Sequence, residues 1–164
     1  MTVVIRPAEP TDAPDITVIW NRIIADTTVT FTTDLKTTDG IAADITARQA
    51  AGQGYLVVVA GDQLLGLACY GPFRAGPGYA QTMEHTIYLA EGAQGQGLGR
   101  RLLTALEDHA RHAGLRCLIA GISGENSGAQ RFHAAQGYTE VGRLPQVGTK
   151  FSRALDLVLM QKLL

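Results

Sequence analysis

The sequence predicts an α/β fold built on one mixed, mostly antiparallel twisted sheet. Apolar residues alternate in short β-like runs and recur every three or four positions in longer helical runs, which gives the element order βααβββαβαββ. The tight-turn signal Gly61-Asp62 joins two of the central strands into a hairpin, so the middle of the chain is an antiparallel meander. A β-α-β step follows this meander, and such a step adds a parallel pair of strands.

The N-terminal part of the chain is predicted to form one strand, two helices and a flap. The strand covers residues 3–6, and Thr11 is a suitable N-cap for a helix with an apolar i, i+3, i+4 stripe. Residues 26–36 are rich in threonine and read as an irregular flap. Thr38 is the expected cap of a second helix that continues to about residue 49.

The remaining elements follow from the same two patterns. A surface loop is expected at residues 71–78, and Gly114 and Gly137 end the two later helices. This gives a sheet of about seven strands flanked by about four helices. Strands are expected at residues 55–60, 63–70, 82–89, 115–122, 138–144 and 155–162, and helices from residue 98 and over 126–136.

Length and composition predict one domain that spans residues 1–164, of which 46% are apolar. The formal net charge is -1 and the charges are evenly mixed, which argues against a nucleic-acid or membrane surface. Cys69 and Cys117 lie in apolar runs whose spacing fits no metal site, so we expect buried thiols and no metal. Signal-peptide and membrane-spanning patterns are absent from the sequence, so we expect a cytoplasmic protein.

The segment from Ile87 to Leu103 carries the clearest functional signal. An apolar strand enters a loop with glycines at 92, 95, 97 and 99, and a helical pattern leaves it. Glycines leave the backbone bare, and the first N–H groups of a helix have no partner inside it. Such a loop is suited to hold phosphate.

The spacing of the loop selects among known phosphate-binding designs. The dinucleotide fingerprint G-x-G-x-x-G fails because its last glycine would fall on Arg100 or Leu102. A P-loop needs a lysine followed by serine or threonine, which this segment lacks. Gln94, Gly97 and Gly99 do fit the spacing Q/R-x-x-G-x-G/A. The alternative is a merely flexible turn before a helix.

This loop resembles the pyrophosphate loop of the GNAT superfamily of acetyl-CoA-dependent N-acetyltransferases, and the element order is that of the GNAT fold. The block N-x-x-A-x-x-x-H-x-x-x-G-Y, which starts at Asn126, is similar to the segment that completes the acetyl-CoA site in that superfamily. The resemblance covers essentially the whole chain. Blocks that resemble the phosphinothricin acetyltransferase branch, including the methionine sulfoximine and methionine sulfone acetyltransferases, lie at residues 20–31, 70–74, 84–88, 132–133 and 150–151.

The resemblance implies that acetyl-CoA binds along the strand and the glycine loop. The main chains of Ile87 and Leu89 would pair with the pantetheine arm, and the Leu89 N–H would polarise the thioester carbonyl. Two departures from the family pattern are Glu91, where proline is usual, and Gln94, where arginine is commoner. The implied cofactor residues are Ile87, Tyr88, Leu89, Gln94, Gly95, Gln96, Gly97, Leu98, Gly99, Arg100 and Asn126.

Glu84 and His133 are the candidate catalytic residues. An amine attacks a thioester only when it is unprotonated, so an ammonium acceptor needs a base. Glu84 alternates with apolar residues in its strand and is expected to face the cleft, where partial desolvation raises a carboxyl pKa. His133 stands where many GNAT members carry a tyrosine that protonates the leaving thiolate, and histidine can serve as that acid. The alternatives are a solvated strand glutamate and a packed helix histidine.

The acceptor is expected to contact Phe31, Phe73 and Arg74 in addition to Glu84. Arg74 follows an aromatic residue in a loop beside the expected site, and a guanidinium pairs well with a carboxylate or phosphinate. A solvated loop arginine is the alternative.

Our leading hypothesis is an enzyme that moves an acetyl group from acetyl-CoA to the α-amine of a small amino acid analogue. The analogue would be of the phosphinothricin, methionine sulfoximine or methionine sulfone type, and transfer would be direct, within a ternary complex. One alternative is another amine acceptor, such as a different amino acid, a polyamine or a peptide N-terminus. The other is a non-catalytic acyl-CoA-binding module. The resemblance also implies a homodimer, formed through the apolar C-terminal strand, and a role in detoxification.

Overall fold

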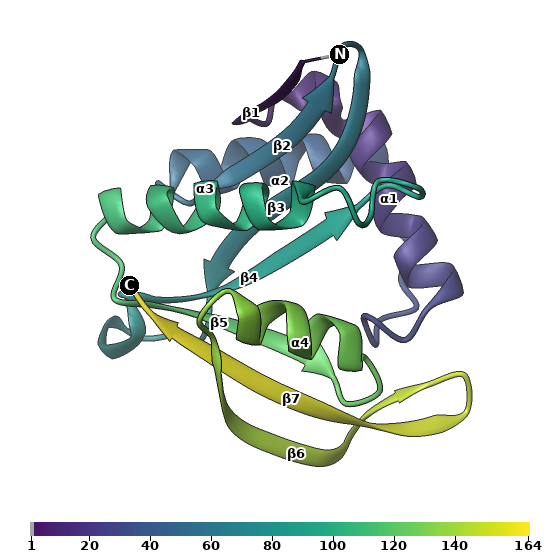
Figure 1. Cartoon of the computed structure of the whole chain (residues 1–164), viewed down its shortest axis with the longest axis vertical. Coiled ribbons are helices and arrows are strands. Elements are labelled where there is room, and N and C mark those ends of the chain that lie inside the picture. Colours follow the sequence, from purple (N-terminus) through teal and green to yellow (C-terminus); the bar gives the residue numbers. More distant parts are fainter. Residues whose placement is uncertain (1) are drawn as a thin grey trace.

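A twisted sheet of seven strands, flanked by four α-helices, organises the computed structural model, which describes residues 2–164 (Figure 1). This architecture confirms the predicted GNAT fold class. The helices are α1 Ala13–Asp26, α2 Thr38–Ala50, α3 Leu98–His112 and α4 Ser127–Ala135. The strands are β1 Val3–Pro7, β2 Tyr55–Ala60, β3 Gln63–Pro72, β4 Thr82–Leu89, β5 Cys117–Ser123, β6 Thr139–Lys150 and β7 Arg153–Leu163.

The strands lie in the spatial order β1-β2-β3-β4-β5-β7-β6. Neighbours pair antiparallel except for β4 and β5, which are parallel because the α3 crossover joins them. The predicted hairpin between β2 and β3 is present, and Gly61 adopts the left-handed backbone (φ 58°) that its tight turn requires. The structure therefore confirms both the predicted antiparallel meander and the predicted β-α-β step.

The parallel pair is very short. Only Thr82, Met83 and Glu84 of β4 pair with β5, opposite residues 117–119. Beyond this point β4 continues to Leu89 and β5 to Ser123 without pairing to each other, so the two strands diverge. We call this opening the fork. It leaves the backbone groups on one edge of residues 85–89 without a strand partner.

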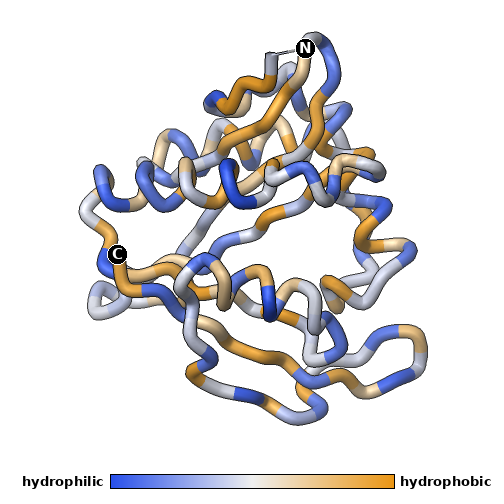
Figure 2. Tube along the Cα trace, in the orientation of Figure 1, coloured by the Kyte–Doolittle hydropathy of each residue, from blue (hydrophilic) through white to orange (hydrophobic). Residues whose placement is uncertain are grey.

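Two apolar cores lie on opposite faces of the sheet. α1 and α2 cover one face, where Ile16, Ile24 and Ile45 are fully buried. α3 and α4 cover the other, where Leu102 and Leu106 of α3 pack on the central strands. Figure 2 shows the apolar residues concentrated along the strands and on the inner sides of the helices. Within residues 2–164, none of the helices has the length and apolar character needed to cross a membrane.

Both predicted caps in the N-terminal part are wrong by one or two positions. α1 begins at Ala13, after a 3-10 turn (Pro10–Asp12), and the Glu9 N–H donates to the Asp12 carboxylate at 2.8 Å. The local carboxylate therefore caps this turn in place of Thr11. α2 is capped by Thr37, whose Oγ1 accepts from the Gly40 N–H at 3.0 Å, and not by Thr38.

The C-terminal hairpin is much longer than predicted. β6 continues to Lys150 and β7 begins at Arg153, whereas the sequence predicted that these strands end at residue 144 and begin at 155. Two register shifts in β6 interrupt the alternation on which the prediction relied. The turn itself places Phe151 (φ 51°) and Ser152 (φ 59°) in the left-handed region, a conformation that neither residue type signals in a sequence.

Candidate functional site

A cavity of about 870 Å³ opens at the fork between β4 and β5. Segments that are distant in the sequence line it: the loop after α1, strands β4, β5 and β7, the glycine loop before α3, and helix α4. The lining residues are Val29, Thr30, Phe31, Glu84, His85, Thr86, Ile87, Tyr88, Leu89, Gln94, Gly95, Gly97, Leu98, Gly99, Arg100, Ala120, Gly121, Ile122, Ser123, Asn126, Gly128, Ala129, Phe132, His133, Gln136 and Leu157.

The cavity passes from one face of the sheet to the other. Ile87 and Leu89 of β4 pack with the core under α3 and α4, whereas Tyr88 between them packs with the core under α1 and α2. Successive strand residues point to opposite faces, so both faces of β4 contribute to the same lining. The fork makes this possible because no β5 residue closes the sheet beside residues 85–89.

The glycine loop forms the part of the cavity next to α3. Gly95 and Gly97 have φ values of 76° and 73°, and a Cβ added at either would meet no atom within 4 Å. Glycine is therefore required at these two positions because of the left-handed backbone conformation, and not because a side chain would clash. Arg101 N donates to Gly97 O at 3.2 Å, and the intrahelical hydrogen bonds of α3 begin there. The N–H groups of residues 98–100 therefore have no acceptor within the helix. These groups and the helix dipole favour an anion.

Two predicted cofactor residues have structural duties as well. Asn126 lines the cavity and caps α4, since its Oδ1 accepts from the Ala129 N–H at 3.0 Å. Its amide NH₂ group is the donor that it can offer to a ligand. Gln96 does not line the cavity; its Nε2 donates to Gly92 O at 3.1 Å and closes the loop on itself. The other predicted cofactor residues all line the cavity.

Glu84 lies at the point where β4 and β5 separate. It is the last β4 residue paired with β5, and its carboxylate opens into the cavity. A Cβ on Gly121 of β5 would lie 3.1 Å from Glu84 Oε1, so this glycine makes room for the carboxylate. Desolvation raises the pKa of Glu84. Within residues 2–164 no cation lies within 4.0 Å of it, so nothing offsets that effect.

His133 forms a buried pair with His85 of β4. Its Nδ1 is 2.8 Å from the Ala129 carbonyl, which can only accept, so Nδ1 carries the proton. Its Nε2 therefore accepts from His85 Nε2, 3.0 Å away, which leaves His85 Nδ1 buried without a partner. Burial lowers the pKa of both rings. The neutral His133 thus has no free N–H for a leaving thiolate, which argues against the predicted proton donation.

Phe73 and Arg74 do not line the cavity. They follow the end of β3, and both side chains turn to the ring of Tyr79 in the same loop. The Arg74 guanidinium lies over that ring at 5.6 Å and is exposed to solvent. Of the predicted acceptor contacts, only Phe31 and Glu84 reach the cavity in this chain.

Sequence analysis missed two residues that shape the site. Gly121 interrupts an otherwise apolar strand, and a strand-interior glycine often marks the close approach of another group. That signal was available. The second is His85, whose pairing with His133, 48 positions later, depends on the packing of α4 and has no local signal.

A glycine loop suited to hold phosphate on one face of a split sheet, together with a carboxylate of raised pKa at the split, fits a group-transfer enzyme whose cosubstrate carries phosphate. Residues 20–138 match the model of the acetyltransferase (GNAT) family, and the chain belongs to this family. The resemblance seen in the sequence is therefore confirmed, and the protein is an N-acetyltransferase of the GNAT type.

Individual relatives match over nearly the full chain. An L-methionine sulfoximine/L-methionine sulfone acetyltransferase of Salmonella typhimurium is 38% identical over 157 residues, covering 96% of this chain and 92% of its own. A phosphinothricin N-acetyltransferase of Streptomyces coelicolor is 34% identical over 157 residues, with 93% and 91% covered. The solved structure of an acetyltransferase from Salmonella typhimurium with its cofactor acetyl-CoA has a TM-score of 0.96, 37% identity, and coverage of 99% and 94%.

The histidine pair predicts a loss of stability in mild acid. Burial and the neighbouring ring lower the pKa of His85 to about 3, whereas the unfolded chain takes up this proton near the ordinary value of about 6.5. The unfolded state therefore binds more protons between these values, and the free energy of unfolding falls as the pH falls. One such histidine lowers it by about 2 kcal/mol between pH 7 and pH 5, measurable by urea denaturation.

Two variants test the source of this loss. His85→Phe removes one of the two titrating rings and should reduce the dependence between pH 7 and pH 5, leaving the part that His133 contributes. His112→Gln, at an exposed position on α3, serves as the matched control and should leave the dependence unchanged. An undiminished loss in His85→Phe would mean that other groups cause it.

Proposed function

We propose that this enzyme transfers the acetyl group of acetyl-CoA to the α-amine of a small amino acid analogue of the phosphinothricin, methionine sulfoximine or methionine sulfone type. The observation that carries the proposal is the fork, because the glycine loop and Glu84 open there into one cavity. The names of the relatives from Salmonella typhimurium and Streptomyces coelicolor support this class of acceptor.

The residues on the α3 side of the cavity fit coenzyme A. The first N–H groups of α3 and the nearby Arg100 suit a pyrophosphate. The free edge of residues 85–89 can add an extended, amide-containing arm in the manner of another strand. Such an arm would run from the glycine loop along β4 towards Glu84, so the two halves of the cavity would bring donor and acceptor together.

The proposed chemistry begins with the proton on the acceptor. The Glu84 carboxylate accepts it, and the raised pKa makes this residue a better base than an ordinary carboxylate. The amine then attacks the thioester carbonyl, so a C–N bond forms as the C–S bond breaks, and the Leu89 N–H would stabilise the carbonyl oxygen. The amine releases its second proton to solvent, and the thiolate takes one from solvent.

Direct transfer is favoured over a covalent acyl-enzyme. Cys69 is fully buried outside the cavity lining, and burial raises the pKa of its thiol to about 12, so it stays protonated. Cys117 does not line the cavity either. Ser123 lines it, but is buried and sits beside no histidine among its hydrogen-bond partners in residues 2–164. A ternary complex needs none of these nucleophiles.

The acceptor half of the cavity lies against the loop after α1. Thr30 and Phe31 line it, and Leu157 of β7 lies close to Gly121 beside Glu84. Arg74 is retained as the proposed partner of the acceptor's acidic group. Its guanidinium is exposed and held to Tyr79 only by a cation–π contact worth about 1 kcal/mol at such sites, so it can move.

A thiol-release assay with acetyl-CoA tests the function. We expect turnover with phosphinothricin, methionine sulfoximine and methionine sulfone to exceed that with ordinary amino acids and polyamines. Preference for a polyamine or another amine would replace the proposed acceptor class but keep the donor. Binding of acetyl-CoA by calorimetry without thiol release with any of these amines would instead indicate a non-catalytic acyl-CoA-binding module.

Glu84→Gln tests the base. The amide keeps the shape of the side chain but cannot accept the ammonium proton, so we expect kcat to fall by roughly 10² or more, the usual scale for losing a general base. The KM for acetyl-CoA should change little. Glu140→Gln, on the exposed part of β6, is the control and should keep full activity. Unreduced kcat in Glu84→Gln, with the same pH profile, would assign proton removal to water.

A cytoplasmic homodimer is the proposed state of the enzyme. β7, the C-terminal strand through which the dimer was predicted to form, is paired on both sides by β5 and β6. We therefore assign the contact to the edge strand β6, which carries the exposed apolar residues Val141 (54% exposed), Leu144 and Val147 (54%) that a second copy would cover. Sedimentation should give the mass of two 17.4 kDa chains. Val141→Glu should shift it to one chain, whereas Val18→Glu, on the exposed side of α1, should not. A wild-type monomer would contradict the proposal.

A further inference from the structure

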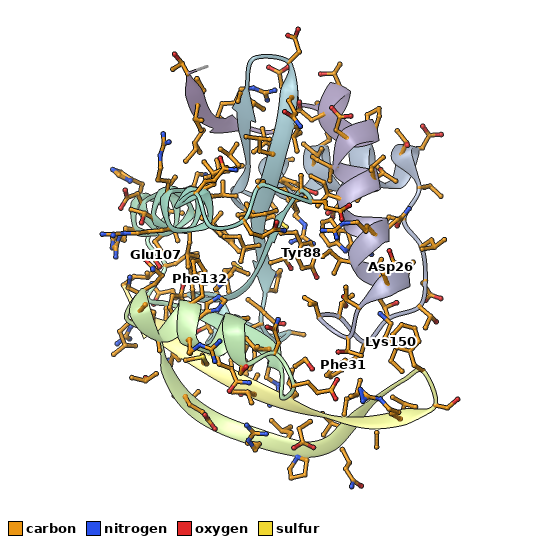
Figure 3. All side chains as sticks on the ribbon, turned by 45° about the vertical axis from the view of Figure 1, so that its right-hand side comes forward. Asp26, Phe31, Tyr88, Glu107, Phe132 and Lys150 are labelled. Atoms are coloured by element: carbon orange, nitrogen blue, oxygen red, sulfur yellow. The ribbon has the colours of Figure 1, made fainter. Side chains whose placement is uncertain are left out.

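Lys150, near the tip of the long hairpin, holds the loop that follows α1. Its side chain is only 2% exposed, and its Nζ donates to the carbonyl oxygens of Thr27 at 2.6 Å and Thr30 at 2.9 Å. Figure 3 shows Lys150 and Phe31 beside each other where the loop meets the hairpin. The loop residues 27–31 belong to no helix or strand, so this contact supplies hydrogen bonds that regular structure does not.

This buried ammonium has an unusual set of partners. Within residues 2–164, no carboxylate lies within 4.0 Å of Lys150 Nζ, and both of its acceptors are main-chain carbonyls. Desolvation lowers the pKa of Lys150, as expected for a charge buried without a counter-ion. The ammonium is therefore held by the loop, and its two hydrogen bonds fix the loop carbonyls in place.

Gly148 fixes the loop from a second point. It lies two residues before Lys150 in β6, on the same buried face, and a Cβ placed on it would lie 2.8 Å from Cγ of Phe31 and 2.5 Å from Cε2. The Phe31 ring therefore packs directly on bare backbone. Any larger residue at 148 would displace the ring, which lines the cavity.

The turn after Lys150 adds a third contact. Phe151 and Ser152 both have positive φ, and strain of this kind persists only where surrounding structure fixes it. The turn brings in Arg153, which donates to both oxygens of Glu125 at 2.6 and 2.7 Å, and Glu125 accepts from Thr28 Oγ1 at 3.0 Å. This exposed contact is weak beside the buried one.

We propose that Lys150 is a positioning residue that sets the affinity for the acceptor. It holds residues 27–31 as a wall of the cavity on the side of Glu84, and Gly148 gives the Phe31 ring its seat in that wall. The kinetic part of this inference rests on the proposed function, whereas the structural part does not. Neither Lys150 nor Gly148 belongs to the glycine loop or to the cavity lining, so we expect substitutions at these two positions to leave the affinity for acetyl-CoA unchanged.

Lys150→Met removes the ammonium and keeps the length of the side chain. Hydrogen bonds from a charged donor contribute enough that we expect the KM for the acceptor to rise by roughly tenfold or more. The KM for acetyl-CoA should stay within about twofold, because the phosphate-binding N–H groups do not depend on the loop. Hydrogen–deuterium exchange, measured without any substrate, should become faster by about tenfold or more in a peptide covering residues 27–31.

Lys162→Met is the matched control. Lys162 is also a part-buried lysine, which donates to Glu107 Oε2 at 2.7 Å and to Gln136 O at 2.7 Å, far from the loop. Lys162→Met should lower the free energy of unfolding. It should leave hydrogen–deuterium exchange in residues 27–31 unchanged, and it should not raise the KM for the acceptor relative to that for acetyl-CoA. Gly148→Ala is a second variant that keeps Lys150; it should raise the KM for the acceptor and leave that for acetyl-CoA unchanged.

The outcomes separate the inference from the proposed function. Unchanged exchange in residues 27–31 of Lys150→Met would overturn the inference, whatever the acceptor proves to be. Equal increases in both KM values, or the same acceptor effect in Lys162→Met, would also overturn it, since they indicate a general structural loss. Faster exchange in residues 27–31 of Lys150→Met, in an enzyme that acetylates none of the tested amines, would support the positioning role of Lys150 and refute the proposed acceptor class.

Discussion

Three residue pairs hold β4 against β5, and the early end of that pairing shapes everything around the site. A sheet that stayed paired would be a closed wall between the two helical layers. Because the strands separate after Glu84, one strand edge is free, the Glu84 carboxylate stands at the opening, and the glycine loop and the loop after α1 reach the same space from opposite faces. Helices α3 and α4 pack on one side of the sheet around this opening, and α1 packs on the other.

Much of the fold is predictable from local sequence, because strands and helices differ in the period of their apolar residues. The bounds of β2 and β4 are those predicted, and the glycine loop lies where its spacing places it. The caps of α1 and α2 were misplaced because neighbouring residues compete for the same N–H groups. The end of β6 was predicted too early, because register shifts in this strand break the alternation of apolar residues on which the prediction depends.

The site divides along the same line. The part of the cavity next to α3, which we propose for the donor, is built mainly on the continuous segment 87–100 with α4 added, so the sequence predicts most of its residues. The part proposed for the acceptor combines residues 29–31 with Glu84, Gly121 and Leu157, and only the fold brings these together. His85 and Lys150 belong to the second kind, since their partners are 48 and at least 120 positions away. Pairings over such separations leave no periodic trace in a single sequence.

The passage through the sheet also bears on how such enzymes diversify. In the proposed arrangement each substrate meets its own set of elements, with the crossover and α3 on one side and the first loop with the terminal hairpin on the other. Substitutions at the hairpin tip can reshape one entrance while the other keeps its geometry. With that arrangement, new amine acceptors can arise through changes in the hairpin without changes in the elements proposed to bind the nucleotide, and the long bulged hairpin is the part of the fold best placed to vary.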